Sequence, residues 1–302
     1  ARRDLISEIT KMITAIWIAL GLLTLWFGFV LFRDLHRHRD QLEPESSWLK
    51  TGIIGFVVNF FDVLGIGAFA PQTALLKFFG QTKDRVLPGT LNVANTLAVL
   101  LQAFLFIGIV EVEPLTLIAM ILAAMAGAVF GAGMIARWTE RQIRLTMGIA
   151  LLVTVLFMLA GQLNWITGGG DALGLTPGKL AVAVAGNFIL GALMTAGIGL
   201  YAPCMALVYA LGMSPLVAFP VMMGSCAFLM PPASVRFIKA GAYNRKAAVG
   251  MAIPAIGAVL LAALVVKSLP LHALRWVVMV VILYTAFIML KSGMNRPRGV
   301  PG

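Results

Sequence analysis

The sequence predicts an all-α polytopic membrane protein with two inverted repeats, from its composition, its long apolar runs and an internal repeat. Hydrophobic residues form 60% of the 302 residues and charged residues only 12%, a balance that soluble globular proteins do not show. A bilayer span needs roughly 20 apolar residues. Such runs cover residues 12–32, 90–110, 115–136, 145–163, 215–231, 247–266 and 271–290.

These runs are expected to be helices, because backbone polar groups in lipid must be satisfied within the segment. The first run, 12–32, is expected to be a retained helix, since it is long for a signal core and no small-x-small site precedes the charged stretch 33–39. The expected units are an N-terminal helix with a charged cytoplasmic loop (1–50), a first repeat (51–165), a Gly-rich linker (166–178), a second repeat (179–292) and a tail (293–302).

The internal repeat has an offset of 132 residues. The run GIGAFAP at 65–71 returns as GIGLYAP at 197–203, and the same offset relates Gly80 to Gly212 and Pro88 to Pro220. In each copy the glycines and the proline interrupt an apolar segment, at 51–80 and at 180–212. Each interrupted segment is either a kinked span or a hairpin that enters the membrane and returns to the same side.

The distribution of Lys and Arg favours the hairpins. If both interrupted segments cross, 12 basic residues lie on one side and 11 on the other; if both return, the division is 17 to 6. Cytoplasmic loops carry the excess of Lys and Arg, so the basic side is expected to be cytoplasmic. Each repeat then holds one hairpin and three spans, which inverts the second copy. Broken helices in inverted repeats are typical of alternating-access transporters, with the substrate held between the breaks.

The glycine patterns resemble the sulfite exporter TauE/SafE family over about residues 51–290. Gly55-Phe56 with 65–67 and Pro71 carry the likeness in the first copy, and Gly191 with 197–199 and Pro203 in the second. The small-hydroxyl segments 89–91 and 224–226 resemble the family as well. The sequence departs from the family at Ala68 and Leu200, where a third glycine is usual, and the N-terminal helix looks like an addition to the family core.

The resemblance implies transport of a small sulfur-containing anion such as sulfite, sulfoacetate or another organosulfonate, exported across the bacterial inner membrane with the C-terminus in the cytoplasm. Helix N-termini at the breaks offer N–H groups to an anion, and the membrane potential drives anions outward. The alternative is uptake of another small anion, such as thiosulfate, sulfate or a carboxylate. An intramembrane enzyme or an assembly subunit is disfavoured, because neither needs two matched broken hairpins.

The expected site lies between the two tips and has no catalytic residue. Its substrate-binding residues are expected to be Gly65, Ile66, Gly67, Thr90, Asn92, Asn95, Gly197, Ile198, Gly199, Gly224, Ser225 and Cys226. The asparagines either donate to the anion or join helices. Asp62 is either a proton-coupling carboxyl or a structural residue near Asn59.

The remaining partners are the lipid bilayer and the small anion itself. The net charge of +11 does not indicate nucleic acid, because the basic residues are dispersed over short loops. Cys204 and Cys226 lie in apolar surroundings without metal-ligand spacing, so they are expected to fill the core or to act as weak donors. We therefore expect no metal ion and no cofactor, and a homodimer stays open.

Overall fold

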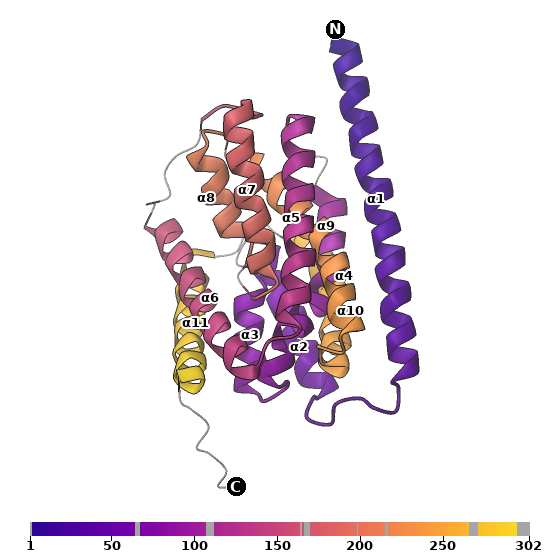
Figure 1. The fold of residues 1–302 in the computed structure, drawn as a ribbon, viewed down its shortest axis with the longest axis vertical. Helices are drawn as coiled ribbons and strands as arrows, with labels where there is room; N and C mark the ends of the chain where they lie inside the picture. Colours follow the sequence, from indigo (N-terminus) through magenta and orange to yellow (C-terminus); the bar gives the residue numbers. More distant parts are fainter. Residues whose placement is uncertain are drawn as a thin grey trace.

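The computed structural model describes residues 2–63, 67–106, 112–163, 165, 170–197, 199–214, 217–265 and 271–294. These residues form a bundle of helices (Figure 1). The helices are α1 (Arg2–Arg37), α2 (Trp48–Asp62), α3 (Phe69–Phe78), the short 3-10 helix η1 (Asp84–Val86), α4 (Leu87–Phe106), α5 (Pro114–Ile135), α6 (Glu140–Gln162), α7 (Pro177–Met194), α8 (Tyr201–Ala210), α9 (Ala218–Lys239), α10 (Arg245–Val265) and α11 (Leu271–Met294).

Within the described residues, seven helices are long and apolar enough to cross a membrane. Six of them, α1, α4, α5, α6, α9 and α10, cover runs that the sequence predicts as spans. The seventh, α7, belongs to the second interrupted segment, and the last predicted span is occupied by α11. The chain is therefore a polytopic helical membrane protein, as predicted.

Both interrupted segments return to the end from which they start. Before α2, the Ser46 hydroxyl donates to the Gln81 carbonyl beyond α3 at 2.7 Å. At the other hairpin, the Lys179 ammonium in the first turn of α7 donates to the Leu211 carbonyl after α8 at 2.9 Å. Figure 1 shows α2 and α3 in the lower half of the bundle and α7 and α8 in the upper half. The hairpins thus enter from opposite ends and approach each other in the middle.

The helices of the two halves follow one another at the spacing that the repeat predicts. α3 covers 69–78 and α8 covers 201–210, so both ends are shifted by 132 residues (201 minus 69 and 210 minus 78). Two longer helices in each half, α5 and α6 against α10 and α11, begin 131 residues apart (245 minus 114 and 271 minus 140). The first arm of each hairpin packs on the other half, α2 on α10 and α7 on α5.

Two glycines of the family pattern allow this close packing. A Cβ on Gly55 of α2 would come within 3.0 Å of the Met251 backbone in α10. A Cβ on Gly191 of α7 would meet the Ala124 backbone in α5 in the same way. Small residues at such crossings let helix backbones approach, and van der Waals contact then holds helices together in lipid. These glycines therefore join the two halves of the bundle.

Some helix boundaries differ from the prediction. α1 continues through the charged stretch to Arg37, because charged side chains at the end of a helix remain in water and support the last turn. α9 continues through Pro231 and Pro232 to Lys239. Prolines are tolerated in membrane helices when neighbouring side chains bind the helix, and Ser234 of α9 shares a 2.8 Å hydrogen bond with Thr96 of α4.

Hydrogen bonds collect the predicted cytoplasmic loops at one end of the molecule, which we call the basic end. Asn244 before α10 contacts Ser46 at 2.9 Å, and the Arg245 guanidinium donates to Asp34 of α1 at 2.8 Å. The opposite end joins the start of α5 to the linker before α7, where the Glu113 N–H donates to the Leu173 carbonyl at 2.8 Å. Burial raises the pKa of Tyr243, at the basic end, above its ordinary value.

Candidate functional site

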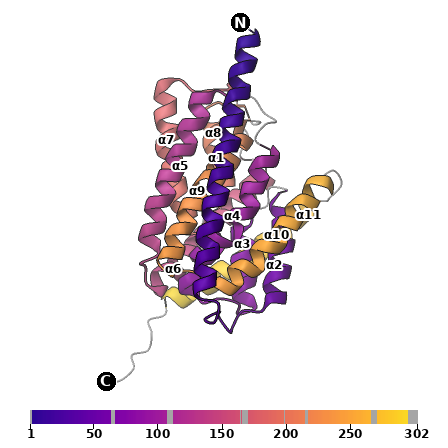
Figure 2. The same cartoon turned by 90° about the vertical axis from the view of Figure 1, so that its right-hand side faces the viewer.

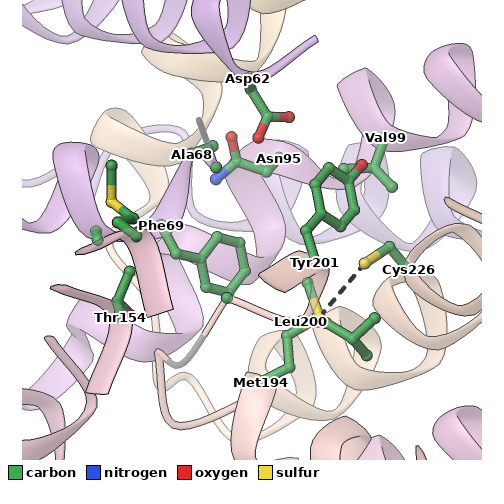
Figure 3. Close-up of a pocket in the computed structure, with 14 residues that line it drawn as sticks. Asp62, Ala68, Phe69, Asn95, Val99, Thr154, Met194, Leu200, Tyr201 and Cys226 are labelled. Carbon is green, nitrogen blue, oxygen red and sulfur yellow. Dashed lines mark hydrogen bonds between the residues drawn. The ribbon is translucent and has the colours of Figure 1, made fainter. Parts of the chain in front are cut away.

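A cavity of about 80 Å³ lies where the two hairpin tips meet, and we call it the tip cavity. Figure 3 shows Phe69 and Tyr201, the first residues of α3 and α8, facing it beside Asp62 and Asn95. Helices α4, α6, α7 and α9 complete the wall. The lining residues are Asp62, Gly67, Ala68, Phe69, Ala70, Asn95, Val99, Thr154, Met158, Met194, Gly199, Leu200, Tyr201 and Cys226.

Two helix N-termini converge on this cavity. The first N–H groups of an α-helix have no acceptor within the helix, and neither N-cap, Ala68 of α3 or Leu200 of α8, provides a side-chain cap. Both N-termini carry the positive end of the helix dipole. The described lining contains no Lys, Arg or His. An anion in the cavity would therefore be held by backbone amides and neutral side chains.

The glycines at the tips have unequal backbone conformations. Gly67 has φ +87° and Gly197 has φ +103°, both in the left-handed region that favours glycine. Gly199 lines the cavity without a left-handed φ, and a Cβ there would meet nothing within 4 Å. The turn in the second tip is thus made at Gly197, and Gly199 leaves space beside the cavity.

Asp62, the last residue of α2, is the carboxyl of the cavity lining. It is only 4% exposed, and its Oδ2 accepts a hydrogen bond from the Gln102 amide of α4 at 2.8 Å. The Tyr201 hydroxyl of α8 donates to the other end of the same amide, Gln102 Oε1, at 3.1 Å. One chain of hydrogen bonds therefore joins the first tip, α4 and the second tip. The hydrogen-bond partners of Asp62 are neutral donors within the described residues.

The other polar side chains near the tips are paired with one another. Asn95 of α4 and Gln72 of α3 exchange two amide hydrogen bonds of 2.6 and 2.8 Å, and the Asn95 amide also donates to the Leu91 carbonyl. Asn187 of α7 donates to Ser225 of α9 at 2.9 Å. Hydrogen bonds of this kind hold helices together in lipid. The Asn95 amide would have to exchange a partner to contact a substrate.

The structure brings some of the predicted site residues to the cavity. Asp62, Gly67, Asn95, Gly199 and Cys226 line it. The predicted residues Gly65, Ile66 and Ile198 lie outside the described residues.

The remaining predicted residues are not part of the described lining: Thr90, Asn92, Gly197, Gly224 and Ser225. The Thr90 hydroxyl donates to Val86 and accepts from the Asn244 N–H near the basic end. The Asn92 amide donates to the Pro88 carbonyl one turn earlier in α4, at 2.9 Å. The contacts of Thr90 and Asn92 are therefore within or between helices.

Several lining residues were not predicted from the sequence. Phe69 and Tyr201 occupy equivalent places in the two copies, two residues after the last glycine of each GIG, so the repeat could have identified them. Thr154 and Met158 come from α6, where the sequence shows no motif. Cys226 donates to the Met194 sulfur at 3.8 Å, and Cys204 is buried in α8.

The comparison with protein families agrees with the resemblance in the glycine patterns. The pattern of the family described as Sulfite exporter TauE/SafE matches residues 6–158. The chain belongs to this family. The matched range begins in α1, so the N-terminal helix falls within the family pattern and is not an addition to it, as the sequence suggested. Comparisons with curated proteins and with solved structures gave no significant match.

The family match fixes the class of this protein. TauE/SafE proteins are membrane transporters, and the apolar helices give this chain the multi-pass form of one. The match covers the first hairpin and ends within α6, so the second hairpin is related to the family through the internal repeat.

Proposed function

We propose that this TauE/SafE protein carries a small sulfur-containing anion through the tip cavity, and that sulfite is its preferred substrate. The convergence of two uncapped half-helix N-termini on one cavity supports an anionic substrate. A water molecule needs about 10–15 Å³ of such volume, so the cavity of about 80 Å³ suits an ion of a few heavy atoms. This size favours sulfite over sulfoacetate and larger organosulfonates.

The proposed direction is export across the inner membrane. A negative interior drives each anionic charge outward by about 2.3 kcal/mol per 100 mV. Neutral hydrogen bonds contribute roughly 0.5 to 1.5 kcal/mol each, so a site without a fixed cation can also release its ligand. Uptake of thiosulfate, sulfate or a carboxylate is the alternative that the flux experiment separates.

The proposal is tested by flux of radiolabelled sulfite in proteoliposomes that contain the purified protein. An interior-negative potential should accelerate sulfite efflux, and unlabelled sulfite should compete better than sulfate, acetate or sulfoacetate. Faster flux of sulfate or a carboxylate would replace the substrate. Absence of flux for all these anions, from protein that remains folded, would favour the assembly-subunit alternative.

We further propose that Asp62 is protonated while the anion is bound. An ionised carboxylate about 5 Å from an anion would repel it by about 3 kcal/mol at an effective dielectric constant of 20. The lining contains no Lys or Arg to offset this repulsion. Asp62 already has neutral hydrogen-bond partners that a protonated carboxyl can keep. Binding of the anion therefore takes up one proton.

This proton uptake predicts that anion binding weakens as pH rises, up to tenfold per pH unit. The probe is methanesulfonate, whose charge is constant across neutral pH. The Asp62→Asn variant should bind with little pH dependence. Tyr201 and Cys226 are the other titratable groups of the lining, and Cys204 is buried in α8. The control variant Tyr201→Phe should keep the pH slope. An unchanged slope in Asp62→Asn would assign Asp62 a purely structural role.

A further inference from the structure

A second concave site lies at the basic end, between the last turns of α1 and α9. This groove has a volume of about 480 Å³ and is separate from the tip cavity. Its basic residues include Arg33 and Arg37 of α1 and Lys239 of α9, and its apolar wall includes Phe29 of α1 and Ile238 of α9. We call it the basic groove.

The acidic residue of the groove is already neutralised. The Asp34 carboxylate accepts from the Arg245 guanidinium at 2.8 Å and from the Tyr243 hydroxyl at 2.6 Å. Arg33, Arg37 and Lys239 form no ion pair with any other residue that the structure describes. The groove thus offers three cationic side chains without a counterion from the described part of the protein.

The position of the groove relates it to the lipid. Figure 2 shows α1 on the outside of the bundle, crossing in front of the other helices. Only 22% of the α1 span is buried, and Leu25, Phe29 and Phe32 are 63–72% exposed. This apolar surface ends at Arg33 and Arg37, so the groove lies where a helix exposed to acyl chains reaches water.

We propose that the basic groove binds the headgroup of an anionic phospholipid. Arg33, Arg37 and Lys239 would contact the phosphate oxygens, and an acyl chain would lie along Phe29. Basic pockets between membrane helices are suited to anionic headgroups, because charge attraction and acyl-chain burial add. The continuity with the exposed face of α1 is why we assign a lipid to this site and not a soluble phosphate. The lipid would brace α1 against α9.

The experiment measures binding of phosphatidylglycerol to the purified protein by native mass spectrometry, with phosphatidylcholine as reference. The test variant combines Arg33→Gln, Arg37→Gln and Lys239→Gln. Its affinity for phosphatidylglycerol should fall roughly 100-fold, since each basic residue near an anionic surface adds about fivefold.

The matched control removes the same charge elsewhere at the basic end, with Arg39→Gln, Lys83→Gln and Arg85→Gln, and should bind the lipid as the unmodified protein does. Equal losses in both triple variants would mean general charge attraction and would overturn the site. Soluble glycerol phosphate that displaced the lipid fully would assign a free-anion site instead. A dimer that formed without added lipid and protected the groove would assign this face to a second copy.

Discussion

At the scale of single residues, the two tip glycines of the second copy have different tasks. Gly197 makes the turn with φ +103°, and a Cβ there would come within 3 Å of Met147. Gly199 lines the cavity and has open space around the position of a Cβ. A substitution at Gly197 therefore strains the backbone and the packing, whereas a small side chain at Gly199 enters only the cavity.

We predict that Gly199→Ala folds normally and reduces sulfite flux several-fold, because one methyl group takes a large share of an 80 Å³ cavity. The measurements are proteoliposome flux and the melting temperature in detergent. Gly257→Ala in α10 is the control, since a Cβ at this exposed glycine also meets nothing within 4 Å. Normal flux in Gly199→Ala would remove this tip from the substrate path.

The sequence was a partial guide to the site residues. Asp62, Asn95 and Cys226 were found because polar or small residues near a glycine break stand out in an apolar chain. For Asn92 and Ser225, which lie outside the lining, sequence could not show the partners: the Pro88 carbonyl binds one and the Asn187 amide the other. Helix rotation, set by packing, decides which polar face meets the cavity.

At the scale of the helices, an ion cluster fastens the first hairpin to α6. Asp84 of η1 contacts the Lys77 ammonium of α3 at 2.6 Å and the Arg144 guanidinium of α6 at 2.7 Å. The Asp84 side chain is only 9% exposed. Removal of the central charge would leave two cations facing each other in a partly buried place, which is the costly way to break an ion pair.

We predict that Asp84→Asn lowers the free energy of unfolding by about 2 to 4 kcal/mol, measured as a lower melting temperature in detergent. The control is Asp40→Asn, whose carboxylate is 86% exposed beside Arg39; exposed pairs contribute about 0 to 1 kcal/mol. If both variants melted alike, the cluster would not hold the hairpin.

The helix pattern itself was largely predictable. Apolar runs located the spans and the GIG breaks located both hairpins, because each signal is local to the chain. Two boundaries were wrong for reasons outside the local sequence. The last turns of α1 are fixed by contacts of Asp34 with Tyr243 and Arg245, and α9 is held through its prolines by packing on α4. Those contacts join residues far apart in the chain.

At the scale of the whole molecule, the two ends differ in charge. The loops at 33–50, 77–85, 137–144 and 236–246 meet at the basic end, whereas Glu113, Asp171 and Lys179 lie with the opposite end. This arrangement has the charge asymmetry that the positive-inside rule associates with a cytoplasmic face. The hydrogen bonds show which loops are together, and the orientation in the membrane is a prediction.

We predict that the basic end faces the cytoplasm. Single cysteines at Lys83 and Lys239 should resist an impermeant thiol reagent in intact cells and react after permeabilisation, because both side chains are exposed at this end. A cysteine at Asp171 should react in intact cells. The native Cys204 and Cys226 are buried, so the background should be low. Reaction of Lys83→Cys and Lys239→Cys from outside, with protection of Asp171→Cys, would reverse the orientation. It would also turn the outward drive on anions into a test of uptake, since the same hairpins would then open toward the opposite compartments.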